Sequence, residues 1–255
     1  MVRWLVQAAC RLAWLLAMFD KLLTGKVSLI TGASRGIGLA LAGTLGRMGS
    51  KLALCARDSN RLFRAAMELE RSGFPVLAVP ADVTRSDELA LLVEKVEASL
   101  GPIDILINNA GIGYFAPVQD TTEANWDAVL GTNLKGAFLL SRLVAPGMVL
   151  RRAGHIVNIA SLAGKSAFAG GATYCASKWG LLGFTQSMAE DLRPFGIRVT
   201  AVCPGTVATE FSPHVGKAAD KMLQPEDVAH AVEMILTESP QSFISEVVLR
   251  PTQKA

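Results

Sequence analysis

Cysteine, histidine and charged residues are scarce in this sequence, and each shortage excludes a class of protein. The chain has 3 histidines and 4 cysteines, and the cysteines lack the spacing of a disulfide framework or a zinc site: Cys10, Cys55, Cys175 and Cys203. We therefore expect reduced, buried thiols, no metal ion and a cytoplasmic location. Charged residues make up only 18% of the chain and the net charge is +3, without a lysine and arginine run, which excludes a disordered protein and a nucleic-acid partner.

Hydrophobic residues make up 51% of the 255 residues, enough for one large core in a single domain over residues 25–255. From Lys26 onward, short apolar or β-branched runs alternate with stretches that repeat apolar residues every three or four positions. This alternation predicts an α/β fold with a parallel sheet covered on both faces. The expected strands are Val27–Ile30, Leu52–Cys55, Val76–Val79, Ile105–Asn108, His155–Ile159, Arg198–Val202 and Glu246–Leu249. The expected helices are Leu39–Met48, Asn60–Arg71, Asp87–Ser99, Glu123–Leu150, Tyr174–Arg193 and Asp227–Leu236.

The first 24 residues differ from the rest and predict an apolar helix ahead of the domain. At about 100° per residue, Arg3, Gln7, Arg11 and Lys21 fall near one stripe and leave a wide apolar face. A peripheral membrane helix through residues 1–23 fits this pattern, whereas a spanning helix would submerge Arg11 in lipid. Two alternatives stay open: the helix packs on the domain or across an oligomer interface, or the segment is a cleaved or misassigned start.

A glycine-rich turn, Thr31–Gly38, follows the first expected strand and comes directly before a helix. Its three glycines can provide a tight turn, a close backbone approach to a pyrophosphate, and close packing of the helix on the strand. We therefore predict that a dinucleotide binds at this turn. The spacing differs from the commoner Gly-x-Gly-x-x-Gly, so a purely structural loop is the alternative. The residues expected to contact the dinucleotide are Gly32, Ser34, Arg35, Gly36, Ile37 and Gly38.

The second expected strand leads to Arg57, at the place where an NAD-binding fold commonly has an acidic residue for the ribose hydroxyls. A guanidinium there can instead bind a 2′-phosphate, and Arg35 adds a second positive charge. This pair predicts NADP(H) as the cofactor, and a solvated Arg57 beside Asp58 is the alternative. Asp82 and Val83 follow the third strand and suit the adenine edge, although an acid at such a place also caps helices.

Tyr174 and Lys178 lie four residues apart in an expected helix, which places them on the same face one turn apart. An adjacent ammonium favours the phenolate and moves a tyrosine pKa down from its usual value of about 10, toward the range that proton transfer requires. Ser161 follows the fifth strand, at the sheet edge where open α/β folds bind ligands. Each residue alone is ordinary, as a helix-surface pair and a turn serine, but the combination predicts catalysis at a carbonyl or alcohol carbon.

Together these motifs resemble the short-chain dehydrogenase/reductase family over Gly25 to Pro251. Besides the glycine-rich turn, the resemblance rests on Asn108-Asn109-Ala110-Gly111, Asn133, Ser161, the Tyr174 and Lys178 pair, and Pro204-Gly205. It implies a Rossmann-type, doubly wound, seven-stranded parallel sheet with strand order 3-2-1-4-5-6-7. The catalytic tetrad that it implies is Asn133, Ser161, Tyr174 and Lys178. The cofactor contacts that it implies are Asp82, Val83, Asn109, Ala110, Gly111, Tyr174, Lys178, Pro204, Gly205, Val207 and Thr209.

The resemblance also implies a mechanism, in which a hydride passes from the nicotinamide of NADP(H) to a carbonyl carbon. Tyr174 donates the proton and Ser161 polarises the oxygen in this scheme. Lys178 is implied to hold the nicotinamide ribose, and Asn133 to position a water that links the lysine to solvent. We expect reduction to be the working direction, because the cellular supply of NADPH drives reductions.

The segments expected to select the substrate, 162–171 and 207–224, contain no decisive charged pair, and the first is small and apolar. We expect a neutral or hydrophobic ketone, as for 3-oxoacyl carrier-protein reductases and related ketone reductases, and a homodimer or homotetramer. The tail Ser245–Pro251 differs from the glycine-rich ending of the carrier-protein reductases, and membrane contact would favour a lipid-derived ketone, a sterol or a retinoid-like alcohol. The alternative from another class is a non-catalytic NADP(H)-binding regulator or an interaction module. It predicts the loss of a catalytic group, yet all four are in place.

Overall fold

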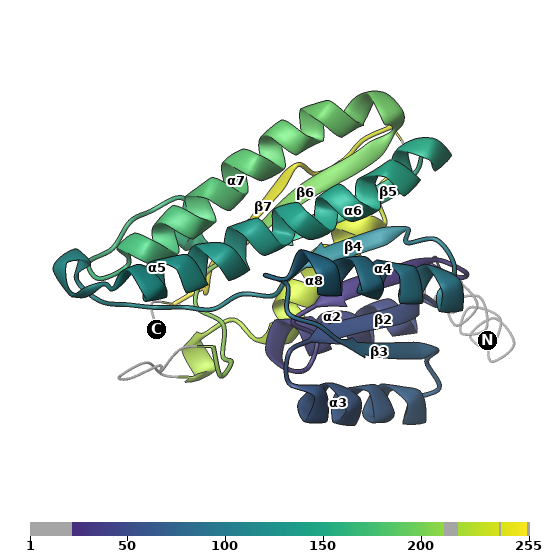
Figure 1. Cartoon of the computed structure of the whole chain (residues 1–255), viewed down its shortest axis with the longest axis horizontal. Coiled ribbons are helices and arrows are strands. Elements are labelled where there is room, and N and C mark those ends of the chain that lie inside the picture. Colours follow the sequence, from purple (N-terminus) through teal and green to yellow (C-terminus); the bar gives the residue numbers. More distant parts are fainter. Residues whose placement is uncertain (1–21, 212–218, 240, 254–255) are drawn as a thin grey trace, which may run out of the picture.

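The computed structural model describes residues 22–211, 219–239 and 241–253. Its strands are Val27–Thr31 (β1), Lys51–Ala56 (β2), Val76–Pro80 (β3), Ile105–Asn108 (β4), Gly154–Ile159 (β5), Ile197–Pro204 (β6) and Glu246–Leu249 (β7). They form a seven-stranded sheet in the order β3-β2-β1-β4-β5-β6-β7, in which every neighbouring pair is parallel (Figure 1). The strand order and the Rossmann-type fold class predicted from the sequence are therefore confirmed.

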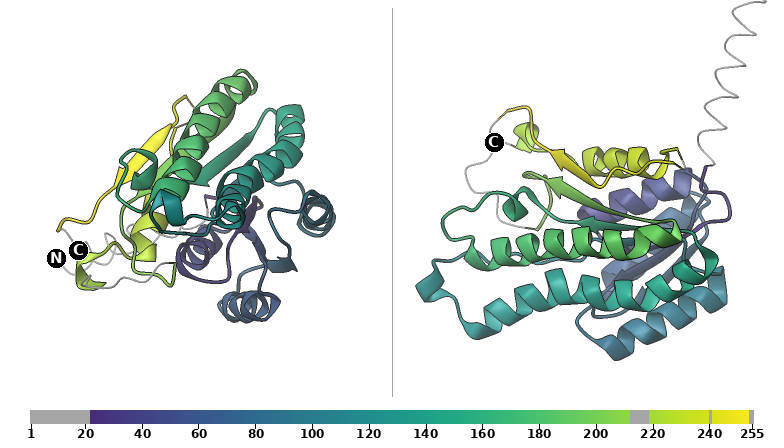
Figure 2. Two further views of the ribbon diagram at one scale, coloured as in Figure 1. Left: turned by 60° about the vertical axis from the view of Figure 1, so that its left-hand side comes forward. Right: turned by 90° about the horizontal axis from the view of Figure 1, so that it is seen from above.

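Helices cover both faces of this sheet, as Figure 2 shows from two further sides. The helices on one face are α2 (Gly36–Arg47), α3 (Ser59–Arg71) and α8 (Pro225–Leu236). Those on the other face are α4 (Ser86–Leu100), α6 (Gly136–Arg151) and α7 (Ala172–Leu192). Short 3-10 turns connect the larger elements at Val118–Asp120, Leu162–Gly164, Arg193–Phe195 and Ala219–Lys221.

Local chemistry fixes where two of these helices begin. The Asp58 carboxylate accepts a hydrogen bond from the backbone N–H of Arg61 at 3.0 Å, which satisfies one of the free donors at the start of α3. At the start of α8, Gln224 and Asp227 form a reciprocal capping box around Pro225, whose fixed φ suits a first helical turn.

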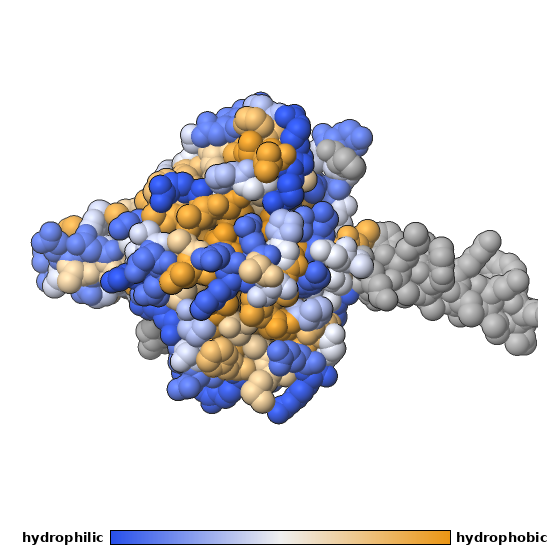
Figure 3. All heavy atoms as spheres, turned by 45° about the vertical axis from the view of Figure 1, so that its right-hand side comes forward, coloured by the Kyte–Doolittle hydropathy of each residue, from blue (hydrophilic) through white to orange (hydrophobic). Residues whose placement is uncertain are grey.

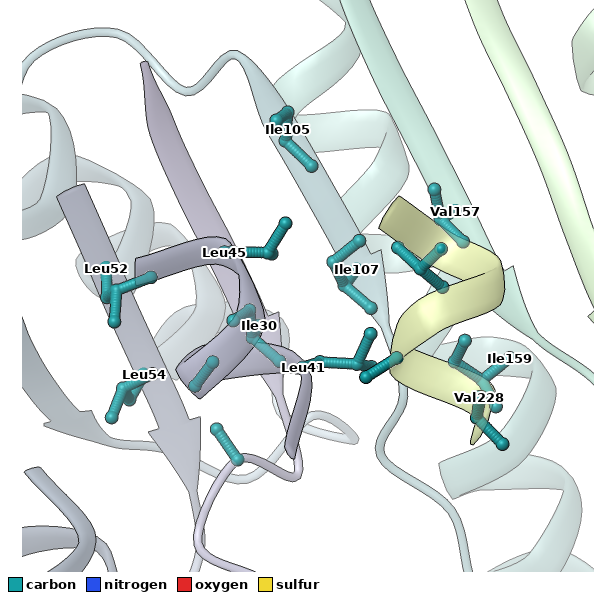
Figure 4. Close-up of a cluster of buried hydrophobic side chains, with 14 of the residues drawn as sticks. Ile30, Leu41, Leu45, Leu52, Leu54, Ile105, Ile107, Val157, Ile159 and Val228 are labelled. Carbon is teal, nitrogen blue, oxygen red and sulfur yellow. The ribbon is translucent and has the colours of Figure 1, made fainter. Parts of the chain in front are cut away.

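The hydrophobic core has two layers, one on each face of the sheet. Figure 4 shows the layer under α2 and α8, where Leu41 lies beside Ile30, and Val228 lies beside Ile159. Because helices cover both faces of the sheet, its central strands are buried and mostly apolar, and all five residues of β1 are buried. The cysteines at 55, 175 and 203 are free and buried, as predicted, whereas Cys10 lies outside the described residues. Other hydrophobic residues reach the surface, in patches between hydrophilic ones on the face in Figure 3.

The predicted single helix Glu123–Leu150 is wrong in one respect. The chain forms α5 (Glu123–Leu130), a π-helical turn over Gly131–Lys135, and then α6. A π-turn widens one helical turn without changing the helix direction, so the apolar spacing on which the prediction rested continues across it. Asn133 lies within this turn and is 2% exposed.

The leader predicted over residues 1–24 lies outside the described residues up to residue 21. Leu22–Gly25 form a turn, and Leu23 is buried with its backbone N–H donating to the Met48 carbonyl at 2.8 Å. The end of the predicted leader is therefore part of the folded domain. Within the described part of the chain, none of the helices has the length and apolar character to cross a membrane. Membrane contact through residues 1–23 and assembly into a homodimer or homotetramer stay predictions.

Candidate active site

A cavity of about 1360 Å³ lies over the carboxyl ends of β1, β4, β5 and β6. Pockets for one small molecule commonly measure about 300–1,000 Å³, so this cavity has room for two ligands. Of the residues predicted from the sequence, those that line it are Gly32, Ser34, Arg35, Gly36, Ile37, Arg57, Val83, Asn109, Ala110, Gly111, Ser161, Tyr174, Lys178, Pro204, Gly205, Val207 and Thr209. Gly38, Asp82 and Asn133 lie outside this lining.

The glycine-rich turn between β1 and α2 presents bare backbone to the cavity. Gly32 and Gly36 have φ angles of +64° and +54°, in the left-handed region that favours glycine. A Cβ atom on Gly38 would lie 2.3 Å from the Gly32 carbonyl oxygen, so glycine is required for α2 to pack this closely on the strand. The N-terminus of α2 therefore faces the cavity without side chains in the way, an arrangement that fits a pyrophosphate.

The loop after β4 is fastened to this turn. The Asn109 side-chain amide donates to the carbonyl oxygens of Thr31 at 2.9 Å and Gly32 at 3.2 Å. The Thr31 hydroxyl oxygen in turn accepts from the backbone N–H groups of Asn109 and Ala110, each at 3.0 Å. Asn109 thus shapes the glycine-rich turn in addition to lining the cavity.

Positive charge gathers at one end of the cavity, which Arg35, Arg57 and Arg61 line. Arg57 makes only a long ion pair, with its Nη1 3.8 Å from Asp82 Oδ2. The other Asp82 oxygen accepts from the backbone N–H and the hydroxyl of Thr84, at 2.9 and 2.8 Å, so this carboxylate is engaged in a turn. Arg61 was not predicted from the sequence, because no local pattern distinguishes a phosphate-binding arginine from any other basic residue in the first turn of an exposed helix.

Tyr174 and Lys178 lie at the start of α7 and are only 9% and 4% exposed. Burial raises the pKa of Tyr174 to about 12, although a hydrogen bond with Ser161 offsets part of the rise. Burial also lowers the pKa of Lys178 to about 8. The expectation that the ammonium moves the tyrosine pKa toward neutrality is therefore not met. The Lys178 Nζ lies 5.8 Å from the Tyr174 ring centroid and donates to the Ile159 carbonyl at 2.8 Å.

Ser161 lines the same cavity as Tyr174. It comes two residues after the end of β5, and its Oγ accepts a hydrogen bond from the backbone N–H of Ala163 at 3.1 Å. Ser161 is close enough to Tyr174 to lower the pKa of the tyrosine, and both side chains line the cavity. A carbonyl oxygen placed between them can accept from both.

Asn133 lies behind the cavity wall and holds the loop in front of it. Its amide accepts from the Ile112 backbone N–H at 2.8 Å and donates to the Ile112 carbonyl at 2.9 Å. It also donates to the Ser177 hydroxyl at 3.0 Å, on the α7 turn between Tyr174 and Lys178. Both amide hydrogens are thus used within the protein, which leaves the oxygen and the main chain to hold a water.

Phe115 and Phe211 flank Tyr174, and Phe168 packs against Phe115; of these three, Phe115 lies outside the segments expected to select the substrate. The Phe115 and Phe211 ring centroids lie 5.4 and 5.7 Å from that of Tyr174, and Phe168 lies 6.0 Å from Phe115. A Cβ atom on Gly113 would lie 2.8 Å from the Phe115 ring, so this glycine gives the ring its place. These rings are 39% to 49% exposed and make the mouth of the cavity apolar.

Comparisons with known proteins give consistent matches. A family model described as short chain dehydrogenase matches residues 26–220. An uncharacterized oxidoreductase of Staphylococcus saprophyticus is 36% identical over 230 residues, which are 90% of this chain and 98% of the relative. A ketoacyl reductase of Nostoc is also 36% identical, over 86% of this chain and 80% of the relative.

Solved structures give the same match in three dimensions. A metagenomic short-chain oxidoreductase in complex with NADP has a TM-score of 0.81 at 43% sequence identity, over 91% of this chain and 99% of that chain. Actinorhodin polyketide ketoreductase with NADPH has a TM-score of 0.81 at 32% identity, over 88% of this chain and 94% of that chain.

Proposed function

Because this chain belongs to the short-chain dehydrogenase/reductase family, we propose that it is an NADPH-dependent reductase of neutral, hydrophobic ketones. The observation that carries the proposal is that the buried Tyr174 and Lys178 line the same cavity as Ser161, and that arginines line the far end of this cavity. The reaction joins a hydride and a proton to a carbonyl group, and its reverse oxidises the alcohol.

The cofactor proposal rests on charge and on backbone shape. The glycine-rich turn leaves space for a pyrophosphate at the start of α2, and Arg35 and Arg57 line the cavity where a 2′-phosphate would extend from the ribose. The residue directly after β2, where an acid would bind the hydroxyls of an unphosphorylated ribose, is Arg57. The NADP and NADPH in the two similar structures support the same choice.

Tyr174 is the proton donor in this proposal. When bound, the reduced nicotinamide supplies the hydride for the carbonyl carbon. With its pKa raised to about 12, Tyr174 carries its proton at neutral pH and can release it to the carbonyl oxygen as negative charge develops there. Ser161 holds that oxygen by a second hydrogen bond and stabilises the same charge. Lys178, whose Nζ lies 5.8 Å from the Tyr174 ring centroid, then supplies the proton that the remaining phenolate takes up.

Proton return to Tyr174 uses the space over Gly111. A Cβ atom on Gly111 would lie 3.3 Å from Asn133 Oδ1 and 3.8 Å from Lys178 Nζ, so this glycine leaves a small polar space between the two side chains. A water held there by Asn133 Oδ1 would give Lys178 a partner for proton exchange. Asn133 thus both positions the Ile112 loop and completes the proton path.

The substrate proposal rests on the phenylalanines at the cavity mouth. Phe115 and Phe211 place apolar rings beside that of Tyr174, and Phe168 packs against Phe115, which favours a ketone with apolar groups on both sides of the carbonyl. The names of two similar proteins, a ketoacyl reductase and a polyketide ketoreductase, support a ketone as the group that is reduced.

The test is the turnover of a panel of aliphatic and aryl ketones with NADPH or NADH, by the wild type and two tyrosine variants. The chain has only 2 tyrosines, so Tyr114→Phe is a matched control for Tyr174→Phe. We expect NADPH-selective turnover that falls by about 10²- to 10⁴-fold in Tyr174→Phe, with the affinity for NADPH retained. Tyr114→Phe should stay near the wild-type rate, because Tyr114 lies outside the cavity lining. Full activity in Tyr174→Phe, or NADPH binding without turnover of any ketone or alcohol, would reject the proposal.

A further inference from the structure

A carboxylate lies between two of the arginines at the charged end of the cavity. Glu210 follows β6, and its Oε2 accepts from Arg61 Nη1 at 2.9 Å and also from Arg35 Nη1. The two guanidinium groups come from the start of α2 and from the first turn of α3, and they converge on this single oxygen atom. Glu210 itself lines the cavity together with both arginines.

We propose that Glu210 occupies the place of a ribose 2′-phosphate, that Arg61 is a further phosphate-binding residue, and that the phosphate must displace this carboxylate to bind. The proposal rests on NADP(H) as the cofactor. It makes Glu210 a specificity-determining residue, since the carboxylate competes with a phosphorylated nucleotide and not with an unphosphorylated one. Two guanidiniums that share one acceptor oxygen are suited to a phosphate, which offers each of them an oxygen of its own.

The exchange is favourable because the internal ligand is held weakly. The Glu210 side chain is 65% exposed, and the Arg35 and Arg61 side chains are 51% and 45% exposed. Ion pairs with this much solvent contact are weak and are screened by salt. A phosphate monoester carries about −1.5 to −2 charges at neutral pH, against a single charge on the carboxylate, so the phosphate wins the competition. The competition nevertheless weakens the binding of every 2′-phosphorylated ligand.

The arrangement also explains why the two arginines stay in place before a nucleotide arrives. Hydrogen bonds from Arg61 and Arg35 lower the pKa of Glu210, so the carboxylate is charged at neutral pH and neutralises one of the two guanidiniums. Without it, the positive side chains of Arg35, Arg57 and Arg61 would repel one another across the cavity end. Glu210 therefore prepares the phosphate site at the cost of some affinity.

Binding of NADPH, NADH and 2′-AMP to the folded enzyme, measured by titration calorimetry, tests the proposal without any turnover. Glu210→Gln removes the competing charge and keeps the shape of the side chain. We expect it to tighten NADPH and 2′-AMP binding by about 3- to 10-fold and to leave NADH within about twofold. Arg61→Gln should weaken NADPH and 2′-AMP binding, and the gain from Glu210→Gln should shrink in the double variant.

The control is Glu68→Gln, which makes the same change of net charge at an exposed position of α3 outside the cavity. This control should change neither the affinity for NADPH nor the affinity for NADH. Unchanged or weaker NADPH binding in Glu210→Gln would overturn the proposal, and so would equal tightening of NADPH and NADH. A wild type that does not bind NADPH more tightly than NADH would instead reject the proposed function, a result that is visible before any variant is made. Thermal melting checks that each variant is folded.

Discussion

Two glycines in helices differ in the space that a Cβ atom would find at each of them. At Gly38 in α2, a Cβ would lie 2.3 Å from the Gly32 carbonyl oxygen, closer than unbonded atoms approach. At Gly183 in α7, a Cβ would meet no atom within 4 Å, and the residue is exposed. Gly38 is therefore required by packing, whereas Gly183 only weakens its helix.

Alanine at these two positions should have opposite effects. Gly38→Ala forces α2 away from the glycine-rich turn, so we expect a loss of about 3 kcal/mol or more in the free energy of unfolding, together with loss of nucleotide binding. Gly183→Ala should gain about 0.5–1 kcal/mol, because alanine loses less backbone entropy in a helix. Urea unfolding curves of both variants measure this difference, and similar stabilities for the two would contradict the packing argument.

His155 is a buried histidine that stays neutral. Its Nε2 lies 2.9 Å from the Thr200 hydroxyl oxygen, which donates its own proton to the Ile244 carbonyl at 2.7 Å. Nε2 must therefore carry the hydrogen, and Nδ1 has no hydrogen-bond partner among the described residues. Burial and the neighbouring Arg198 lower the pKa of His155 to about 3.

This histidine should make the protein sensitive to acid. In the unfolded chain a histidine takes up its proton below about pH 6.5, whereas His155 in the folded chain does so only toward pH 3. The unfolded state thus binds more protons between these values, and the free energy of unfolding falls as the pH is lowered through this window. His155→Gln should lose stability less steeply between pH 6.5 and 4 in denaturant unfolding. His230→Gln, at a side chain that is 84% exposed, is the control, and equal slopes in all three proteins would contradict this account.

At the scale of the elements, the sequence predicted the strands well and the helix around Asn133 less well. Strands of a parallel sheet are buried on both faces, so each one is an apolar run between turn residues, and that signal is local. The π-turn at Gly131–Lys135 does not interrupt the apolar spacing between Glu123 and Leu150, so no local signal marks it. It nevertheless turns the Asn133 side chain toward Ile112 and Ser177.

The same distinction separates the site residues that the sequence predicted from those it missed. Ser161 follows the end of a strand, and Tyr174 and Lys178 lie one helical turn apart. Both signals are contained in short stretches of sequence. Arg61 and Glu210 are 149 residues apart and meet only through the fold. Their pairing depends on how the segment after β6 packs over α3, and a short window of sequence does not contain that information.

Replacing Asn133 tests the role of the π-turn. Asn133→Ala removes both hydrogen bonds to the Ile112 backbone and the one to Ser177, which leaves partly buried polar groups unpaired. We expect a loss of about 1–3 kcal/mol in unfolding free energy and a fall in turnover at unchanged NADPH affinity. Stability is measured by urea unfolding and turnover by NADPH oxidation. The same change at the partly exposed Asn125 of α5 is the control, and an Asn133→Ala variant as stable and active as this control would contradict the assignment.

At the scale of the whole molecule, one cavity extends from Arg35, Arg57 and Arg61 to the phenylalanines beside Tyr174. Its walls come from loops after strands that lie in the middle of the sheet, where the strand order changes direction between β1 and β4. The fold class predicts the position of this cavity. The arginines at one end and the phenylalanines at the other indicate which ligands would fit it.

The 149 residues between Arg61 and Glu210 also have a consequence for the chain during its synthesis. At about 5–20 residues per second, a ribosome needs roughly 7 to 30 s to add the carboxylate after the guanidinium. Tyr174 and Lys178 are translated within the same interval, after the glycine-rich turn and Asn109. A nascent chain therefore carries Arg35, Arg57 and Arg61 for many seconds before it carries Tyr174 or Glu210, the carboxylate that pairs with two of these arginines.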